Sequence, residues 1–165
     1  MNWFQGLMWS AIAIAVIALA AVAAGRFGLL QGQAPGDLGV RDGRLKPPST
    51  TPNSVSSQAR LYPEHPRGRD AQIAPLAFKG DGAAALARLA RLVEATAGAR
   101  IVERRADYLY ATYTTPSMHF VDDVEFWLDP AAGVIELRSA SRIGRSDLGQ
   151  NRARIEALRS RFEVE

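Results

Sequence analysis

The sequence predicts an α+β domain that follows an N-terminal transmembrane helix and a linker. An apolar run at the N-terminus, two amphipathic helical stripes and several short alternating segments predict this class. We expect the order strand, helix, four strands, helix, with a five-stranded, mostly antiparallel sheet and both helices on one face. The expected divisions are residues 1–25 for the membrane anchor, 26–70 for a linker that is partly ordered over 44–58, and 71–165 for the globular domain.

The N-terminal run from Leu7 to Ala24 contains Ser10 as its only polar residue. As a helix it is ~27 Å long, which just crosses a hydrocarbon core, so we expect it to contact the membrane as a single-pass anchor. A cleaved signal peptide is the alternative, because Ala21-Val22-Ala23 resembles a cleavage site, although residues 1–6 carry no Lys or Arg. A buried helix is the third interpretation.

Cysteine content and charge exclude several classes of function. The chain has no cysteine, which excludes a disulfide, a thiolate nucleophile and a cysteine-ligated metal. Its net charge of +3 lies in residues 1–70, which hold seven Lys or Arg and four Asp or Glu, whereas residues 71–165 hold thirteen of each. This distribution argues against a nucleic-acid partner and fits a tether near anionic lipid.

Residues 26–70 are rich in Gly, Pro, Ser, Thr and Gln and show no apolar period, which is typical of an irregular linker. Within its ordered part, Val55 is expected to pack on the domain. The elements expected next are a strand over 73–78, a helix over 82–97 opened by Gly80 or Asp81 and ended by Gly98, and strands over 99–104 and 107–115.

Residues 120–128 and 134–143 alternate around a turn-forming segment, which predicts an antiparallel hairpin. Burial of the two apolar faces together sets the register, since a slip by one residue would turn every side chain over. The expected cross-strand pairs are Leu128 with Ile135, Phe126 with Leu137, Val124 with Ser139, and Asp122 with Ser141. The expected ionic pairs on the other face are Glu125 with Arg138, and Asp123 diagonal to Arg138 and Arg142.

Asp122 is the unusual member of the apolar face, because a buried carboxylate costs several kcal/mol unless hydrogen-bond donors surround it. The final helix is expected to begin at Asp147, with Gln150 completing a variant capping box. Asn151 lies on the apolar stripe of that helix. We therefore expect a buried network that joins Asp122 to Ser139, Ser141 and Asn151. The arginines off this stripe are expected to be solvated: Arg152, Arg154, Arg159 and Arg161.

The sheet face opposite the helices is expected to be open. It displays Asp123, Glu125, Trp127, Glu136, Arg138 and Arg142. Such a face is either a solvated surface or a docking surface. The candidate binding residues are Asp122, Asp123, Glu125, Trp127, Arg138, Ser139, Ser141, Arg142 and Asn151. We expect no cofactor, because the weak dinucleotide fingerprint at Gly80, Gly82 and Ala85 lacks the crossover helices of a doubly wound sheet. We expect no metal, because Arg138 and Arg142 are better partners for Asp123 and Glu125, which share strand parity with His119.

Four segments carry a resemblance to a known family: PSTTPNSVSSQ (48–58), IAPL (73–76), DDVEF (122–126) and RSASRIGRSDLGQNRARIEALR (138–159). Over about residues 44–162 the chain resembles the domain of unknown function 1499 family. The resemblance implies a bacterial or plastid protein with an N-terminal membrane or export segment, and it implies no particular activity. Family members often carry cysteines at the positions of Pro48 and Ser54, and both are missing here. The order of elements also resembles TATA-binding-protein-like folds, a likeness that carries no DNA binding.

These observations favour a non-catalytic binding module, associated with the cell envelope, that uses its open sheet face for a protein, envelope or lipid partner. The alternative is a small hydrolase-like enzyme with a site around Asp122, Ser141 and Asn151. Arg26 after the apolar run favours a cytoplasmic domain, but so weak a bias does not prevent translocation. We expect the domain on the periplasmic side, with the cytoplasmic side as the alternative.

Overall fold

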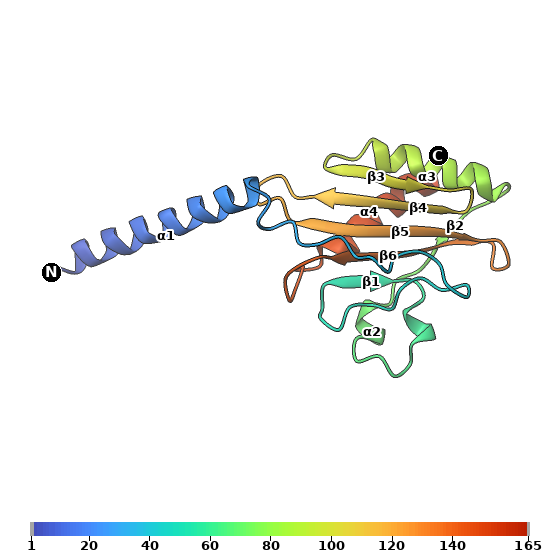
Figure 1. Ribbon diagram of the computed structural model, residues 1–165, viewed down its shortest axis with the longest axis horizontal. Helices are drawn as coiled ribbons and strands as arrows, with labels where there is room; N and C mark the ends of the chain where they lie inside the picture. The colour runs from blue at the N-terminus through green and yellow to red at the C-terminus, as the bar shows by residue number, and fades with distance from the viewer. Residues whose placement is uncertain (1, 165) are drawn as a thin grey trace.

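The computed structural model describes residues 2–164, and it shows one long helix that projects from an α+β domain (Figure 1). The predicted fold class is confirmed. The elements in chain order are α1 (Trp3–Arg26), β1 (Ser54–Ser56), the 3-10 turn η1 (Ala59–Leu61), α2 (Gly68–Ala71), β2 (Leu76–Ala77), α3 (Gly82–Glu94), β3 (Ala99–Arg104), β4 (Tyr108–Thr114), β5 (Val121–Asp129), β6 (Val134–Ser141) and α4 (Gln150–Val164).

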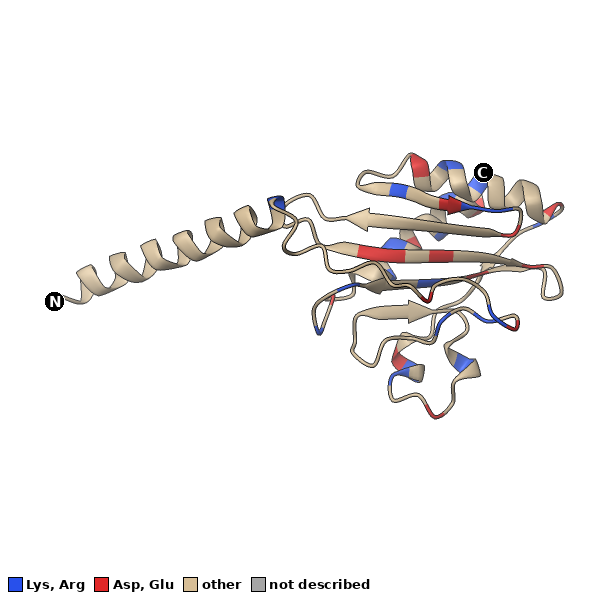
Figure 2. Ribbon diagram, in the orientation of Figure 1, with Lys and Arg blue, Asp and Glu red and all other residues tan. Residues whose placement is uncertain are grey.

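Helix α1 has the length and composition of a membrane span. Its 24 residues are ~36 Å long as an α-helix. An 18-residue stretch of the helix has a mean hydropathy of 2.5, and none of that stretch is buried. In Figure 2 the helix carries no charged residue until Arg26 at its end. The chain therefore has one N-terminal apolar helix, which could be a membrane anchor or a signal sequence.

The sheet is antiparallel throughout, with strands in the order β1-β6-β5-β4-β3, and β2 pairs with the other end of β6. The hairpin of β5 and β6 has the predicted register, including the pairs Phe126 with Leu137 and Asp122 with Ser141. The short edge strand β1 comes from the ordered part of the expected linker, and it brings the sheet to six strands.

Both main helices start near the positions that the sequence indicates. The Asp81 carboxylate caps α3 by accepting hydrogen bonds from the backbone N–H groups of Ala83 and Ala84, at 2.6 and 3.0 Å. Helix α4 begins at Gln150, three residues later than expected. The reason is local, because Leu148 and Gly149 have φ of 54° and 83°, which a helix does not allow.

Helices α3 and α4 cover one face of the sheet, as predicted. The core between them contains Leu89, Val93, Ile155 and Phe162 from the helices, and Leu109, Val124, Phe126, Ile135 and Leu137 from the strands. All of these side chains are nearly inaccessible to solvent. The alternation of β5 and β6 therefore places Asp122, Ser139 and Ser141 on the same side as the helices.

The other face of the sheet is covered, so the expectation of an open face is wrong. Residues 37–47, which we call the strap, run across β5 and β6 after α1 (Figure 1). Leu45 of the strap is buried with Tyr108 and Tyr110, and Leu38, Val40 and Trp127 pack around them. Four ionisable side chains beneath the strap are at most 3% exposed: Asp123, Glu125, Glu136 and Arg138.

Candidate functional site

Buried polar and charged side chains occur on both faces of the sheet. On the side of the helices lies a cluster that contains Asp122, Ser139, Ser141 and Asn151, the residues that the sequence predicts to form one network. The Asn151 side-chain amide donates hydrogen bonds to Ser141 Oγ at 3.1 Å and to the Asn53 carbonyl at 3.0 Å. The Ser139 hydroxyl donates to Asn151 Oδ1. The predicted network of Asp122, Ser139, Ser141 and Asn151 is therefore present.

Arg154 completes this cluster, so its expected solvation is wrong. Its guanidinium pairs with the Asp122 carboxylate. It also donates to Asn151 Oδ1 at 2.7 Å and to Ser139 Oγ at 3.1 Å. The sequence spacing indicates this contact, because Asn151 and Arg154 are three residues apart and therefore share a face of α4.

The cluster is closed to solvent. Asp122, Ser139 and Asn151 are buried. None of five well-formed pockets on residues 2–164 is lined by Asp122, Ser141 or Asn151. None of these pockets therefore gives a substrate direct contact with the Asp122 carboxylate, and the hydrolase alternative gains no support from them.

Arg154 connects the closed cluster to a small pocket between the end of α3 and the start of α4. We call it the Arg154 pocket. It has a volume of about 270 Å³, and its polar lining consists of Thr96, Tyr113, Thr114, Thr115, Gln150, Arg154 and Arg161. The Arg154 guanidinium lies 4.7 Å from the centre of the Tyr113 ring. The Arg161 guanidinium donates to the Thr96 hydroxyl at 3.1 Å.

The Tyr113 hydroxyl is the unusual group in this pocket. Tyr113 is 5% exposed, and its hydroxyl has no hydrogen-bond partner within residues 2–164. Burial raises the pKa of Tyr113 to about 12, although the positive charges of Arg154 and Arg161 act in the opposite direction. The hydroxyl therefore keeps its proton at neutral pH, and it is a buried donor without an acceptor.

The strap-side cluster has less complete pairing. Glu125 Oε1 accepts hydrogen bonds from the Gly39 N–H at 2.7 Å and from the Tyr108 hydroxyl at 2.8 Å. Glu125 Oε2 lies 3.7 Å from Arg138 Nη1, and neither atom makes a hydrogen bond to any part of the chain that the structure describes. Burial raises the pKa of Glu125 and lowers that of Arg138.

Two further groups complete the strap side. The Arg142 guanidinium donates to both oxygens of Asp123, at 2.8 to 3.1 Å, and the Tyr110 hydroxyl donates to the same carboxylate. Glu136 is buried, and its closest cation is Arg60 at 3.8 Å. The predicted ionic pairs of Glu125 with Arg138 and Asp123 with Arg142 are confirmed. Among the described residues, no group of three His, Asp or Glu side chains could hold a metal ion.

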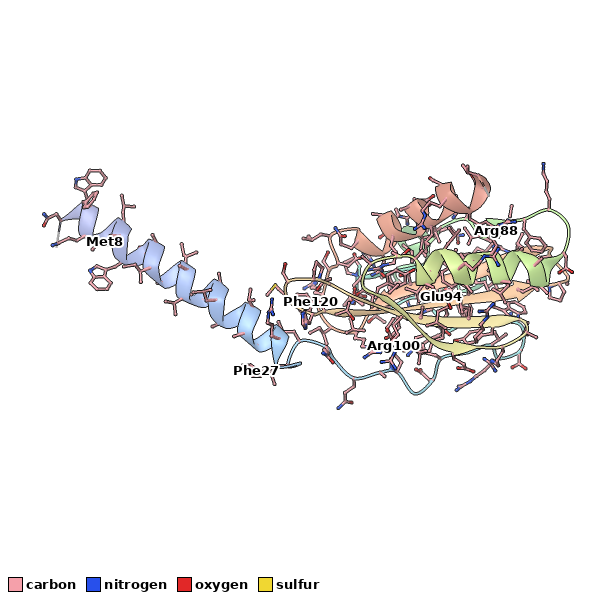
Figure 3. All side chains as sticks on the ribbon, turned by 90° about the horizontal axis from the view of Figure 1, so that it is seen from above. Met8, Phe27, Arg88, Glu94, Arg100 and Phe120 are labelled. Carbon is pink, nitrogen blue, oxygen red and sulfur yellow. The ribbon has the colours of Figure 1, made fainter. Side chains whose placement is uncertain are left out.

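The end of the domain that faces α1 is tightly joined to this helix. A Cβ on Gly25 would lie 2.2 Å from the Met118 carbonyl oxygen, so only glycine allows this approach. A Cβ on Gly32 would lie 2.7 Å from the Ile143 side chain and 2.8 Å from the Arg142 side chain. The loop before β5 and the segment between β6 and α4 both lie at this end (Figure 1), and Figure 3 places Phe27 and Phe120 at the junction.

Comparison with known proteins assigns a family but no activity. The model of the family described as "Protein of unknown function (DUF1499)" matches residues 44–162, and the chain belongs to this family. No curated protein and no solved structure matches the chain. The match includes β1, the Arg154 pocket and both buried clusters, whereas α1 and the first part of the strap lie outside it.

Proposed function

We propose that this member of the DUF1499 family is a non-catalytic binding module that α1 retains at the membrane, with the α1-facing end of the domain resting on the bilayer. Five large hydrophobic side chains outside α1 are exposed within residues 2–164. Three of them lie at the end of the domain that faces α1, where Phe27 and Leu29 closely follow α1 and Leu148 lies in the segment between β6 and α4; they are 84%, 74% and 90% exposed. This clustering is the observation that carries the proposal, because apolar side chains so exposed are stable in a lipid interface.

The short connection between α1 and the domain supports the same arrangement. Gly25 is seated against Met118, and Gly32 against Ile143, so no long free tether separates the sheet from the helix. Arg26 and Arg145 are exposed at the same end. Basic residues near an anionic membrane surface contribute about 1 kcal/mol each to binding. We place the domain on the periplasmic side, since weak charge bias does not retain a domain of this size.

The binding role expected for Glu125, Trp127 and Arg138 stays a prediction, and it now requires that the strap move away from the sheet. Glu125 and Arg138 become accessible only when the strap leaves the sheet, and Trp127 lies half-buried at its edge. A partner of this face would therefore compete with residues 37–47. The chain has no thiol, and none of the five pockets described above is lined by Asp122, which supports binding over catalysis.

The absence of cysteine allows a direct test with single-cysteine variants of the full chain. Leu148→Cys is labelled with an environment-sensitive fluorophore in phospholipid nanodiscs, and Val164→Cys is the matched control. Val164 is 87% exposed near the end of α4 that lies away from α1. We expect blue-shifted emission and quenching by nitroxide lipids at position 148, and water-like emission at 164. Water-like emission at both positions, or equal quenching at both, would contradict bilayer contact.

A further inference from the structure

We infer that the Arg154 pocket binds a phosphate group, and its position assigns the headgroup of a phospholipid as the source. The site stands on its own geometry, and only the lipid source depends on the proposed membrane contact. Its walls come from the end of α3, the end of β4 and the face of α4 that runs from Gln150 to Arg161. These ends lie on the side of the domain toward α1 (Figure 1).

The pocket is positively charged. Arg154 and Arg161 line it, and no Asp or Glu does. Behind the wall, Asp122 balances one of the two guanidinium charges. The remaining charge belongs to Arg161, which has no carboxylate partner among residues 2–164. Its guanidinium donates a hydrogen bond to the neutral Thr96 hydroxyl. An anion in the pocket would therefore contact Arg161, whose charge is not neutralised by a carboxylate of residues 2–164, and Arg154, whose guanidinium is held in place by Asp122.

The Tyr113 hydroxyl supplies the second argument. A buried donor without an acceptor is destabilising, and few remain in folded proteins. Tyr113 lines the pocket, and the charges of both arginines reach its hydroxyl. A phosphate oxygen in the pocket would accept a hydrogen bond from this hydroxyl while it contacts the guanidinium groups, which are the side chains that best match phosphate geometry.

The pocket is prepared for its ligand, and its size limits what enters. Asp122, Asn151 and Ser139 hold the Arg154 guanidinium in one orientation, so little side-chain freedom is lost on binding. Drug-sized ligands use pockets of roughly 300–1,000 Å³. A volume of about 270 Å³ fits a phosphate and a short attachment. The first N–H groups of α4 already donate to Asp147 and Gly149, so the cations form the site and not the helix end.

The test measures phosphate binding to the full chain in a phosphate-free detergent. One arm titrates glycerol 3-phosphate and inorganic phosphate by calorimetry. The other arm counts phosphatidic acid molecules bound to the protein by native mass spectrometry. Arg161→Gln and Tyr113→Phe change the pocket. Arg100→Gln is the matched control, because it removes one exposed charge from β3, outside the pocket lining.

We expect Arg161→Gln to weaken binding roughly tenfold and Tyr113→Phe severalfold, as the loss of a hydrogen bond to a charged group predicts. Arg100→Gln should bind like the wild type, and melting temperatures identify any variant that fails to fold. Binding of the lipid alone supports the headgroup source, whereas binding of soluble phosphate alone keeps the site and overturns that source. Equal affinities for Arg161→Gln and Arg100→Gln in both arms would overturn the site itself, whatever the fluorophore at position 148 reports.

Discussion

The two faces of the sheet bury charge in different ways. On the helix side, the Asp122 carboxylate pairs with Arg154, and the Asn151 amide joins strand β6 to α4. On the strap side, three buried atoms have no hydrogen-bond partner within the described chain: Glu125 Oε2, Glu136 Oε2 and Arg138 Nη1. A helix presents long side chains at fixed positions, whereas the strap contributes mainly backbone groups, such as the Gly39 N–H and the Pro47 carbonyl.

This difference between the two faces indicates which part of the domain can move. A backbone N–H or carbonyl satisfies a hydrogen bond but does not neutralise a charge, so the strap side retains the cost of burying Glu125 and Arg138. On the helix side the Asp122 carboxylate already has its cation, so that ion pair has little left to gain from rearrangement. We therefore expect a partner that reaches the sheet to enter from the strap side, while Arg154 and its pocket stay in place.

The largest effect is expected for Arg154→Leu, which leaves the Asp122 carboxylate buried without its cation. Loss of one partner of a buried pair costs about 3–5 kcal/mol. Denaturant unfolding of the full chain in detergent, followed by circular dichroism, measures this cost. The double variant Asp122→Leu/Arg154→Leu should recover most of the loss. A single variant within about 1 kcal/mol of the wild type would contradict the described pairing.

A somewhat smaller loss is expected when the strap loses its buried side chain. Leu45→Ala removes a side chain that is 1% exposed, which costs about 3 kcal/mol in the unfolding free energy. Leu29→Ala removes the same atoms from an exposed position and should change the unfolding free energy by less than about 0.5 kcal/mol. Equal effects of the two variants would show that the strap does not belong to the folded domain.

The third prediction concerns the pH dependence that Glu125 contributes. Burial raises the pKa of Glu125 above its ordinary value of 4.5, so the folded protein holds this proton more tightly than the unfolded chain. The unfolding free energy from this group therefore falls as the pH rises from 4.5 through the raised pKa, by up to about 1.4 kcal/mol per pH unit. Glu125→Gln removes this titration. A pH-independent difference between wild type and variant would refute the assignment.

The last prediction compares the unfolding free energies of two variants on opposite faces of the sheet, Tyr110→Phe and Tyr113→Phe. The Tyr110 hydroxyl donates to the Asp123 carboxylate, so Tyr110→Phe should cost about 2 kcal/mol. The Tyr113 hydroxyl has no partner in residues 2–164, so Tyr113→Phe should not lower the unfolding free energy and should raise it by about 1 kcal/mol. Thermal unfolding in the absence of phosphate compares them. A large loss for Tyr113→Phe would mean that its hydroxyl is already bonded.

The hairpin and the Asp122 network were predictable because a period of two residues sets both the register and the side of each residue. Asp122 and Ser141 pair as expected, and Asn151 reaches them from α4. Arg154 was missed, because an arginine beside an apolar stripe is usually solvated. Its spacing of three from Asn151 was the available signal.

The strap could not be predicted in the same way. It has no apolar period, and backbone groups make several of its contacts, which leave no trace in residue types. Leu45 is a single buried leucine, and the Glu125 carboxylate accepts from the N–H of a glycine. The Tyr113 hydroxyl and the Arg154 pocket likewise depend on how α3, β4 and α4 end together, which requires the tertiary structure.

The position of the domain on the bilayer is tested most directly by the depth of the residue 148 label in nanodiscs, measured with nitroxides placed at the headgroup and deep in the acyl chains. We expect strong quenching of the label on Leu148→Cys by the headgroup nitroxide, weak quenching by the deep nitroxide, and none by either for Val164→Cys. Quenching at position 148 no greater than at 164 would show that the domain stands away from the membrane, contrary to the proposal.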